Sequence, residues 1–188
     1  MKNAIKYVGL PAILALFAIG GAAQNSFTPE NKTVVSDFER RAKAYAETRE
    51  RLEGQLSKLP KKATAEQIEV HKSALLKSVQ AARSGAKHGD VFTPAASVLV
   101  RNIIKAEFKG RDRRELREAV FEAETKGVPI KVNAAYPEAK ELVEMPPSLL
   151  LALPQLPKQV RYRFVGTSLL LVDRESNLII DYLPKAVP

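Results

Sequence analysis

The chain has 188 residues, a formal net charge of +9 and no cysteine. Without cysteine there is no disulfide, no thiolate metal site and no thiol nucleophile, so the fold must be stabilised by packing alone. The excess of positive charge favours anionic partners such as phosphate-bearing head groups or acidic polymers.

The first 23 residues have the order of a secretory signal peptide. Lys2 and Lys6 form a short positive segment, residues 8–19 are an apolar run, and residues 21–23 supply the small side chains needed for cleavage. The run is too short for a bilayer span of about 20 residues. We expect cleavage near Ala23 and a periplasmic or secreted mature protein without a transmembrane segment. For an exported protein, nucleic acid is not the expected partner.

Residues 31–58 predict one long helix with a heptad seam. The seam consists of Val35, Phe38, Ala42, Tyr45, Arg49, Leu52, Leu56 and Leu59. Thr64 and Gln67 form a capping box that begins a second helix. The short connection predicts an antiparallel helical hairpin over residues 31–86. Its seam either closes on the second helix or supports a homodimer in which two hairpins share a bundle.

Two further helices are predicted after the hairpin. The third begins at Thr93 with proline at its first helical position. Its apolar face consists of Ala96, Leu99, Val100, Ile103, Ile104 and Phe108. Asp112 and Glu115 form a capping box for the fourth helix, which Gly127 closes.

A hinge at residues 84–90 divides the mature chain into a helical unit, residues 24–90, and an α+β module, residues 91–188. In that module, residues 128–132 predict a strand. A proline-punctuated connector follows over residues 137–157, with one turn of helix near its end.

The last segment predicts an antiparallel meander. A two-residue turn at 166–167 pairs Phe164 with Leu169, and a second turn within 174–177 pairs Leu169 with Tyr182. The face expected in the core carries Tyr162, Phe164, Leu169, Leu171, Leu178, Ile180 and Tyr182. The opposite face carries Arg161, Arg163, Val165, Leu170, Val172, Ile179, Asp181 and Leu183.

The opposite face of the meander is too apolar for ordinary solvent-exposed surface. It is either covered by the strand at 128–132 and the connector, or it forms a groove for a partner strand or peptide. Asp173 and Asp181 are the carboxylates with the best spacing for acid–base work, but this register directs them to opposite faces. We therefore expect no catalytic site between them.

Metal and nucleophilic chemistry have little support in the sequence. His71 and His88 are the only histidines, and no carboxylate cluster lies beside either one in the sequence. Neither accompanies a nucleophile motif. We expect no catalytic residue, no metal ligand set and no cofactor, and we interpret His71 as an interface residue on the apolar stripe of its helix.

A basic cluster spans the end of the third helix and the start of the fourth. It consists of Lys105, Lys109, Arg111, Arg113, Arg114 and Arg117. Basic residues in a first helical turn oppose the helix dipole, which favours an anion or anionic-partner site. The alternative is a solvated face balanced by Asp112, Glu115 and Glu118.

The strongest resemblance to known proteins lies in the meander, with YRFVG at 162–166, LLLVD at 169–173 and NLIID at 177–181. With these segments, residues 92–183 resemble a group of uncharacterised exported bacterial proteins. The terminal hairpin alone is similar to periplasmic proteins of the nickel/cobalt-homeostasis type. These resemblances imply a small periplasmic β module, but neither an activity nor a functional residue.

Together these patterns predict an α+β protein with an N-terminal antiparallel helical hairpin, two further helices and a small C-terminal antiparallel β-meander. The function expected is a non-enzymatic, exported interaction protein that docks a partner through the hairpin or the β module. The alternative is a binding module for an anionic ligand or envelope surface through the cluster at 105–117. A hydrolase using carboxylates ranks third. The expected partner is a protein or an anionic envelope component.

Overall fold

The structure is a computed structural model that describes residues 28–109, 129–137 and 145–187. Within these ranges the elements are α1 (Pro29–Glu53), α2 (Ala65–Ala82), α3 (Pro94–Glu107), α5 (Pro147–Ala152), β1 (Val160–Val165), β2 (Ser168–Asp173) and β3 (Ile179–Leu183). The strands form one antiparallel sheet in the order β1-β2-β3. The expected α+β class with a small antiparallel meander is confirmed. The signal peptide and the helix expected from Asp112 lie outside the described residues.

The helices begin where side chains satisfy their first backbone N–H groups. Thr28 and Thr93 cap α1 and α3, each with proline in the first turn. At α2 the predicted capping box is present: the Gln67 backbone N–H donates to Thr64 Oγ1, and the Thr64 N–H donates to the Gln67 side chain. The first helix ends at Glu53, five residues before the predicted end, and Gly54 is its C-cap.

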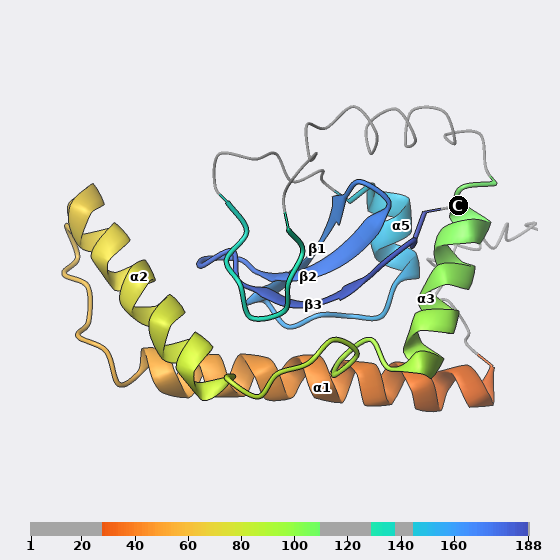
Figure 1. Ribbon diagram of the computed structural model, residues 1–188, viewed down its shortest axis with the longest axis horizontal. Coiled ribbons are helices and arrows are strands. Elements are labelled where there is room, and N and C mark those ends of the chain that lie inside the picture. Colours follow the sequence, from red (N-terminus) through yellow and green to blue (C-terminus); the bar gives the residue numbers. More distant parts are fainter. Residues whose placement is uncertain (1–27, 110–128, 138–144, 188) are drawn as a thin grey trace, which may run out of the picture.

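The helices surround the sheet unevenly. In Figure 1, α1 runs along one side of the sheet, α2 and α3 stand toward opposite ends of α1, and the linker 83–93 follows α1 between them. The predicted seam of α1 therefore contacts more than α2. Phe38 lies 5.4 Å from the Phe92 ring and 6.4 Å from the Tyr162 ring between ring centroids. Within this seam Val35, Phe38, Ala42, Tyr45 and Arg49 are buried, whereas Leu52 and Leu56 are half-buried and Leu59 is exposed. The homodimer stays a prediction.

One hydrophobic core crosses the predicted division at residue 90. It joins Phe38 and Leu75 of the first two helices to Val100 of α3 and to Phe164 and Leu171 of the sheet. These side chains are at most 1 % exposed. The described parts of residues 24–90 and 91–188 therefore share their core.

The first hairpin of the sheet has the predicted register. Phe164 lies opposite Leu169 and Tyr162 lies opposite Leu171. Gly166 in the turn has a φ of 53°, the left-handed conformation that glycine adopts without strain. The first turn was therefore correctly located from its glycine.

The second hairpin departs from the predicted register. Leu171 lies opposite Asp181, where the simple turn predicts Ile180. The register shifts between Leu171 and Val172, as in a β-bulge that adds one residue to β3. The predicted pairing of these two strands is therefore wrong beyond the bulge.

The bulge changes which side chains at the end of β3 face the core. Leu183 belongs to the main core, whereas Tyr182 packs against the cluster on the opposite face of the sheet. The sequence prediction, with Tyr182 on the core face and Leu183 on the opposite face, is therefore wrong for both residues. Asp181 now faces the helical layer, where it accepts hydrogen bonds from the α2–α3 linker. One extra residue thus moves a carboxylate into the core.

The second face of the sheet is covered, as one of the two sequence alternatives predicts. Ile130 and Tyr136 pack on Leu170 and Ile179. The segment 129–137 also pairs with the residue just before β3, through a bridge between Ala135 and Leu178. The strand predicted at 128–132 is wrong for its described residues, 129–132, because the chain turns at residues 132–133 and the bridge comes after this turn, at Ala135.

In the described ranges, no helix combines the length and the apolar character needed to cross a membrane.

Candidate functional site

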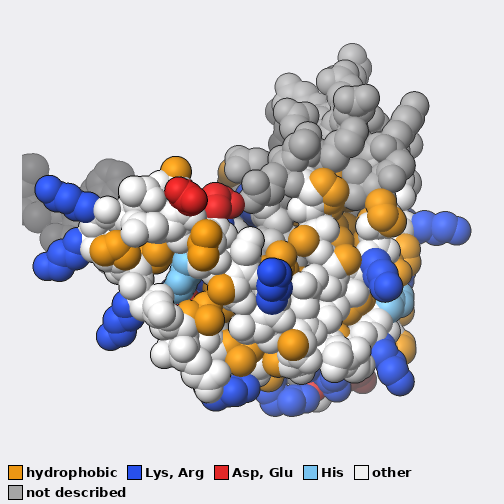
Figure 2. Space-filling model, turned by 60° about the vertical axis from the view of Figure 1, so that its left-hand side comes forward, with side chains coloured by type: hydrophobic (Ala, Val, Ile, Leu, Met, Phe, Trp, Pro, Cys, Tyr) orange, Lys and Arg blue, Asp and Glu red, His pale blue; other side chains and the backbone are white. Residues whose placement is uncertain are grey.

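The basic cluster predicted from the sequence falls mostly outside the described residues. Lys105 and Lys109 are described and exposed, on α3 and just after it. The positions outside are Arg111, Arg113, Arg114 and Arg117. On the face shown in Figure 2, lysine and arginine side chains are scattered among hydrophobic ones, both near the centre and at the margins. The anion site predicted for the cluster stays a prediction.

A buried ion cluster joins α1 to the end of β2. Arg49, the polar residue of the predicted seam, donates from Nε to Asp173 Oδ2 at 3.2 Å. Its Nη1 and Nη2 donate to Oε2 of Glu53 and of Glu175. The Tyr45 hydroxyl donates to Asp173 Oδ2 at 2.9 Å. One guanidinium thus gathers three carboxylates from segments more than 100 residues apart in the sequence.

The electrostatics of this cluster keep its arginine charged. Burial alone lowers the pKa of Arg49, but the charges of Asp173, Glu53 and Glu175 outweigh it and raise the pKa. Burial, and after it the Asp173 charge, raises the pKa of the Tyr45 hydroxyl, so that Tyr45 remains a neutral donor. Because three carboxylates face one guanidinium, the cluster holds two more negative than positive charges.

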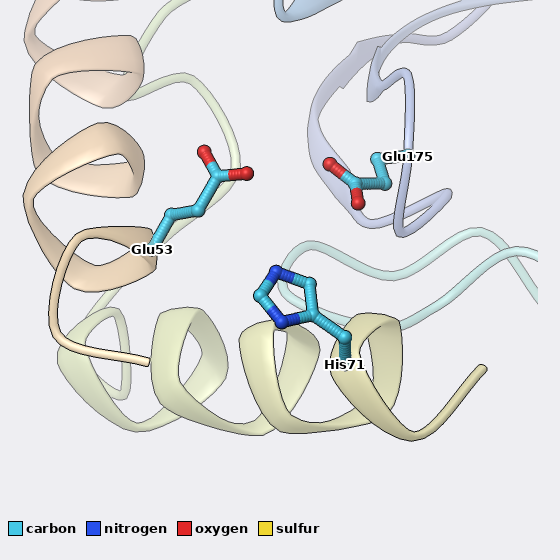
Figure 3. A group of neighbouring side chains, drawn as sticks. All are labelled: Glu53, His71 and Glu175. Carbon is cyan, nitrogen blue, oxygen red and sulfur yellow. The ribbon is translucent and has the colours of Figure 1, made fainter. Parts of the chain in front are cut away.

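His71 lies beside this cluster. His71, Glu53 and Glu175 are half-buried, and each offers one ligand atom within 4.8 Å of the other two. Figure 3 shows the glutamate at the end of α1, the histidine on α2 and the glutamate of the β2–β3 turn directed toward a common space. The sequence gives no sign of this group, because only the fold brings the two glutamates to His71 from separate segments. One imidazole and two carboxylates can hold a metal ion.

His88, the other histidine, has different surroundings. It is exposed in the α2–α3 linker, and its Nε2 lies 3.0 Å from the backbone oxygen of Tyr182. Its ring lies 4.3 Å from the Tyr182 ring between centroids. These contacts tie the linker to β3.

The two aspartates considered for acid–base work both face the helical layer, which corrects the prediction of opposite faces. Asp181 accepts from the backbone nitrogens of Val91 and Phe92 at 2.8 Å each, and from Gly89 at 3.1 Å. Asp173 accepts from α1 and from its own turn. Each carboxylate thus has its own set of partners, which indicates a structural role for each.

A surface groove lies along β1, between this strand and the connector that follows α5. Its volume is about 480 Å³, and its apolar lining includes Met145, Leu150 and Leu156. The Tyr162 hydroxyl donates to the backbone oxygen of Pro154 at 2.9 Å, which fixes the connector beside the strand.

Charged side chains are part of the groove lining. Among the residues that the structure describes, the lining includes Lys158, Arg161, Arg163 and Arg174 and neither aspartate nor glutamate. Lys158 forms an ion pair with Glu50 across 4.0 Å, between side chains that are 86 % and 52 % exposed. Such a pair contributes little. The groove is therefore suited to a ligand that combines apolar groups with negative charge.

Both features were missed in the sequence because each depends on segments that only the fold brings together. Arg49 gave one local signal, a charged residue inside an apolar seam, which is typical of a buried ion pair. Neither Glu175 nor His71 gave a comparable signal. For the groove, the alternation of Arg161 and Arg163 with apolar residues placed both arginines on one face but did not show the connector beside them.

Comparison with protein-family models, with curated proteins and with solved structures gave no match to this chain.

Proposed function

We propose that this chain is a binding module that docks an extended, acidic peptide segment of a partner protein along the outer edge of β1. The observation that carries the proposal is a sheet edge next to a groove that presents the exposed cations Lys158 and Arg174 and, among its described lining residues, no carboxylate. Addition of a peptide strand to a sheet edge is an established mode of recognition, in which backbone hydrogen bonds supply affinity and side-chain pockets supply specificity.

The backbone of β1 has hydrogen-bonding groups for such a strand. Val165 and Ser168 flank the two-residue turn and form a hydrogen-bonded pair, so the pairs alternate along the hairpin. This alternation directs the N–H and C=O groups of Tyr162 and Phe164 away from β2. The Tyr162 oxygen already accepts from Arg163 Nη1 at 3.0 Å, so a docked strand would share that acceptor. In the described ranges, no strand pairs with that edge.

The opposite edge of the sheet differs. There, the segment 129–137 hydrogen-bonds to β3. The backbone N–H of Asn133 donates to the Ile179 oxygen at 2.8 Å, and the Ile179 N–H donates to the Ala134 oxygen at 2.9 Å. Proteins commonly cover sheet edges in this way because unpaired edges bind other strands. The contrast between the edges favours β1 as the docking edge.

Charge selects the peptide. The exposed Lys158 and Arg174 attract an acidic segment and repel a basic one, which contributes to specificity and to the association rate. The apolar lining suits side chains that alternate with the acidic ones along an extended strand. This proposal retains an exported interaction protein that uses its β module, and it assigns no catalysis to the chain.

Fluorescence anisotropy tests the proposal directly. A short labelled peptide that alternates glutamate with valine is expected to bind the purified chain, and binding is expected to weaken as salt is added. The same peptide with lysine in place of glutamate is expected not to bind. A third peptide, with proline replacing alternate valines, is expected to bind weakly because it cannot complete the backbone ladder.

Charge reversal locates the binding site. The double variant Lys158→Glu and Arg174→Glu is expected to lose most of the binding, whereas Lys77→Glu on the exposed side of α2 keeps it. Equal binding of the proline peptide would rule out strand addition. Binding to anionic vesicles without binding to any peptide would support the alternative, an envelope-surface module.

A further inference from the structure

We propose that Glu53, His71 and Glu175 bind a divalent transition-metal ion of the Zn²⁺ type. This site is separate from the peptide groove and does not depend on it. The three ligand atoms lie within 4.8 Å of one another. Ligands around one zinc ion at about 2.0–2.2 Å lie roughly 3.5 Å apart, so modest side-chain movement closes the set. In Figure 3 all three side chains already point into one space.

Arg49 holds the two glutamates in position. Its guanidinium donates hydrogen bonds to Oε2 of Glu53 and to Oε2 of Glu175. Oε1 of each carboxylate therefore remains available for a metal ion. The Arg49 side chain is only 7 % exposed and is fixed by Asp173 through its Nε. Carboxylate ligands that are themselves hydrogen-bonded are typical of metal sites, because such contacts orient the ligand oxygens.

Charge balance favours a doubly charged cation. The carboxylates of Asp173, Glu53 and Glu175 exceed the single positive charge of Arg49 by two. A divalent cation would neutralise this excess, and the nearby guanidinium prevents the site from being more strongly negative. The site therefore fits one divalent ion rather than a cluster of ions.

The imidazole determines the class of metal. Ca²⁺ and Mg²⁺ prefer oxygen ligands, whereas an imidazole with carboxylates suits zinc and its first-row neighbours. Three protein ligands leave a coordination position for water. All three ligand residues are partly exposed, so an ion can reach them from solvent.

Metal binding would connect three elements that are far apart in the sequence. Glu53 ends α1, His71 lies in α2, and Glu175 follows β2. A bound ion would therefore fix α2 against the rest of the fold, and the melting temperature would rise with the metal concentration.

Isothermal titration calorimetry with ZnCl₂ tests the site in the full chain, purified without a polyhistidine tag. We expect one ion per chain and a higher melting temperature. His71→Ala is expected to abolish both effects, and His71 is partly exposed, so this variant keeps its fold. His88→Ala is the matched control, because it removes the other histidine and is expected to bind zinc like the unmodified chain.

Two further variants identify the ligands and the positioning residue. Glu175→Gln keeps the size of the side chain but removes its charge, and it is expected to weaken zinc binding. Arg49→Lys is expected to weaken it about 10–100-fold, as is usual for residues that orient metal ligands. Zinc binding that is unchanged in His71→Ala overturns the proposal, as does the absence of zinc binding. CaCl₂ that binds as tightly as ZnCl₂ also overturns it.

Discussion

The carboxylate of Asp181 lies 2.8 Å from the backbone nitrogen of Val91, although 90 residues separate them in the sequence. The same oxygen accepts from Phe92, and the second oxygen accepts from Gly89. Asp181 is completely buried, so these bonds replace water for the N–H groups of the linker between α2 and α3. A carboxylate of the sheet thus determines how that linker crosses the core.

Asp181→Ala is expected to lower the free energy of unfolding by about 3–5 kcal/mol, because it leaves several buried N–H groups without an acceptor. Asp181→Asn keeps an acceptor oxygen and is expected to cost about half as much. Urea denaturation followed by circular dichroism measures both. Asp90→Ala, in the same linker but exposed, is the control and is expected to cost about 1 kcal/mol or less. Equal costs for the two alanine variants would show that Asp181 does not organise the linker.

The bulge in β3 shows why part of the sheet could not be predicted. The first hairpin was predictable because glycine in its turn and alternating side chains agreed on one register. After the second turn, Tyr182 and Leu183 are both apolar, so alternation cannot distinguish one register from its neighbour. The hydrogen bonds from the linker to Asp181 are compatible only with the bulged register, and they come from a distant segment.

Phe164→Ala is expected to cost about 3–5 kcal/mol, the usual range for a core phenylalanine. The side chain is fully buried, and its ring meets that of Phe108 edge-on at 6.5 Å between centroids. Denaturant unfolding measures the loss. Val98→Ala is the apolar control, because Val98 is 60 % exposed on α3, and it is expected to change stability by no more than about 0.5 kcal/mol. A small loss for Phe164→Ala would contradict the assignment of this face to the core.

Residues 91–188, expressed without the first two helices, are expected not to fold cooperatively. The sequence pattern predicts an independent module, but the core places Phe38 against Phe92 and Tyr162. Removing α1 and α2 would expose the rings of Phe92 and Tyr162. It would also remove the hydrogen bonds that Asp173 accepts from Arg49 and Tyr45. A thermal melt followed by near-ultraviolet circular dichroism measures the outcome, with residues 24–188 as the control. A sharp transition in the short fragment would restore the module as a separate domain.

The candidate sites were less predictable than the elements that carry them. Capping residues such as Thr64 and Thr93 act over three or four positions, so their helices could be located in the sequence. The group of Glu53, His71 and Glu175 depends on where α2 docks, which is set by packing of side chains such as Leu75 across the core. No local pattern specifies that docking.

Stability is expected to fall as the pH rises above about 10. Burial raises the pKa of the Tyr162 hydroxyl, and the charge of Glu39 raises it further. The pKa of the Tyr45 hydroxyl is also raised, first by burial and then by the charge of Asp173. The unfolded chain releases these protons from about pH 10, whereas the folded chain keeps them. The folded state then binds more protons, so its stability is fully present below about pH 10 and decreases above it.

Each such tyrosine contributes a slope of up to about 1.4 kcal/mol per pH unit in this range. Urea midpoints between about pH 9 and pH 11.5 measure the slope, since that range brackets the ordinary tyrosine pKa. Tyr162→Phe removes one titrating group and is expected to flatten the decline, while costing about 1 kcal/mol at neutral pH because the backbone oxygen of Pro154 loses its donor. Tyr45→Phe is expected to flatten the decline in the same way. Its cost at neutral pH is expected to be larger, because the hydrogen bond that it removes goes to the charged carboxylate of Asp173. A decline of unchanged steepness in both variants would show that other groups control alkaline unfolding.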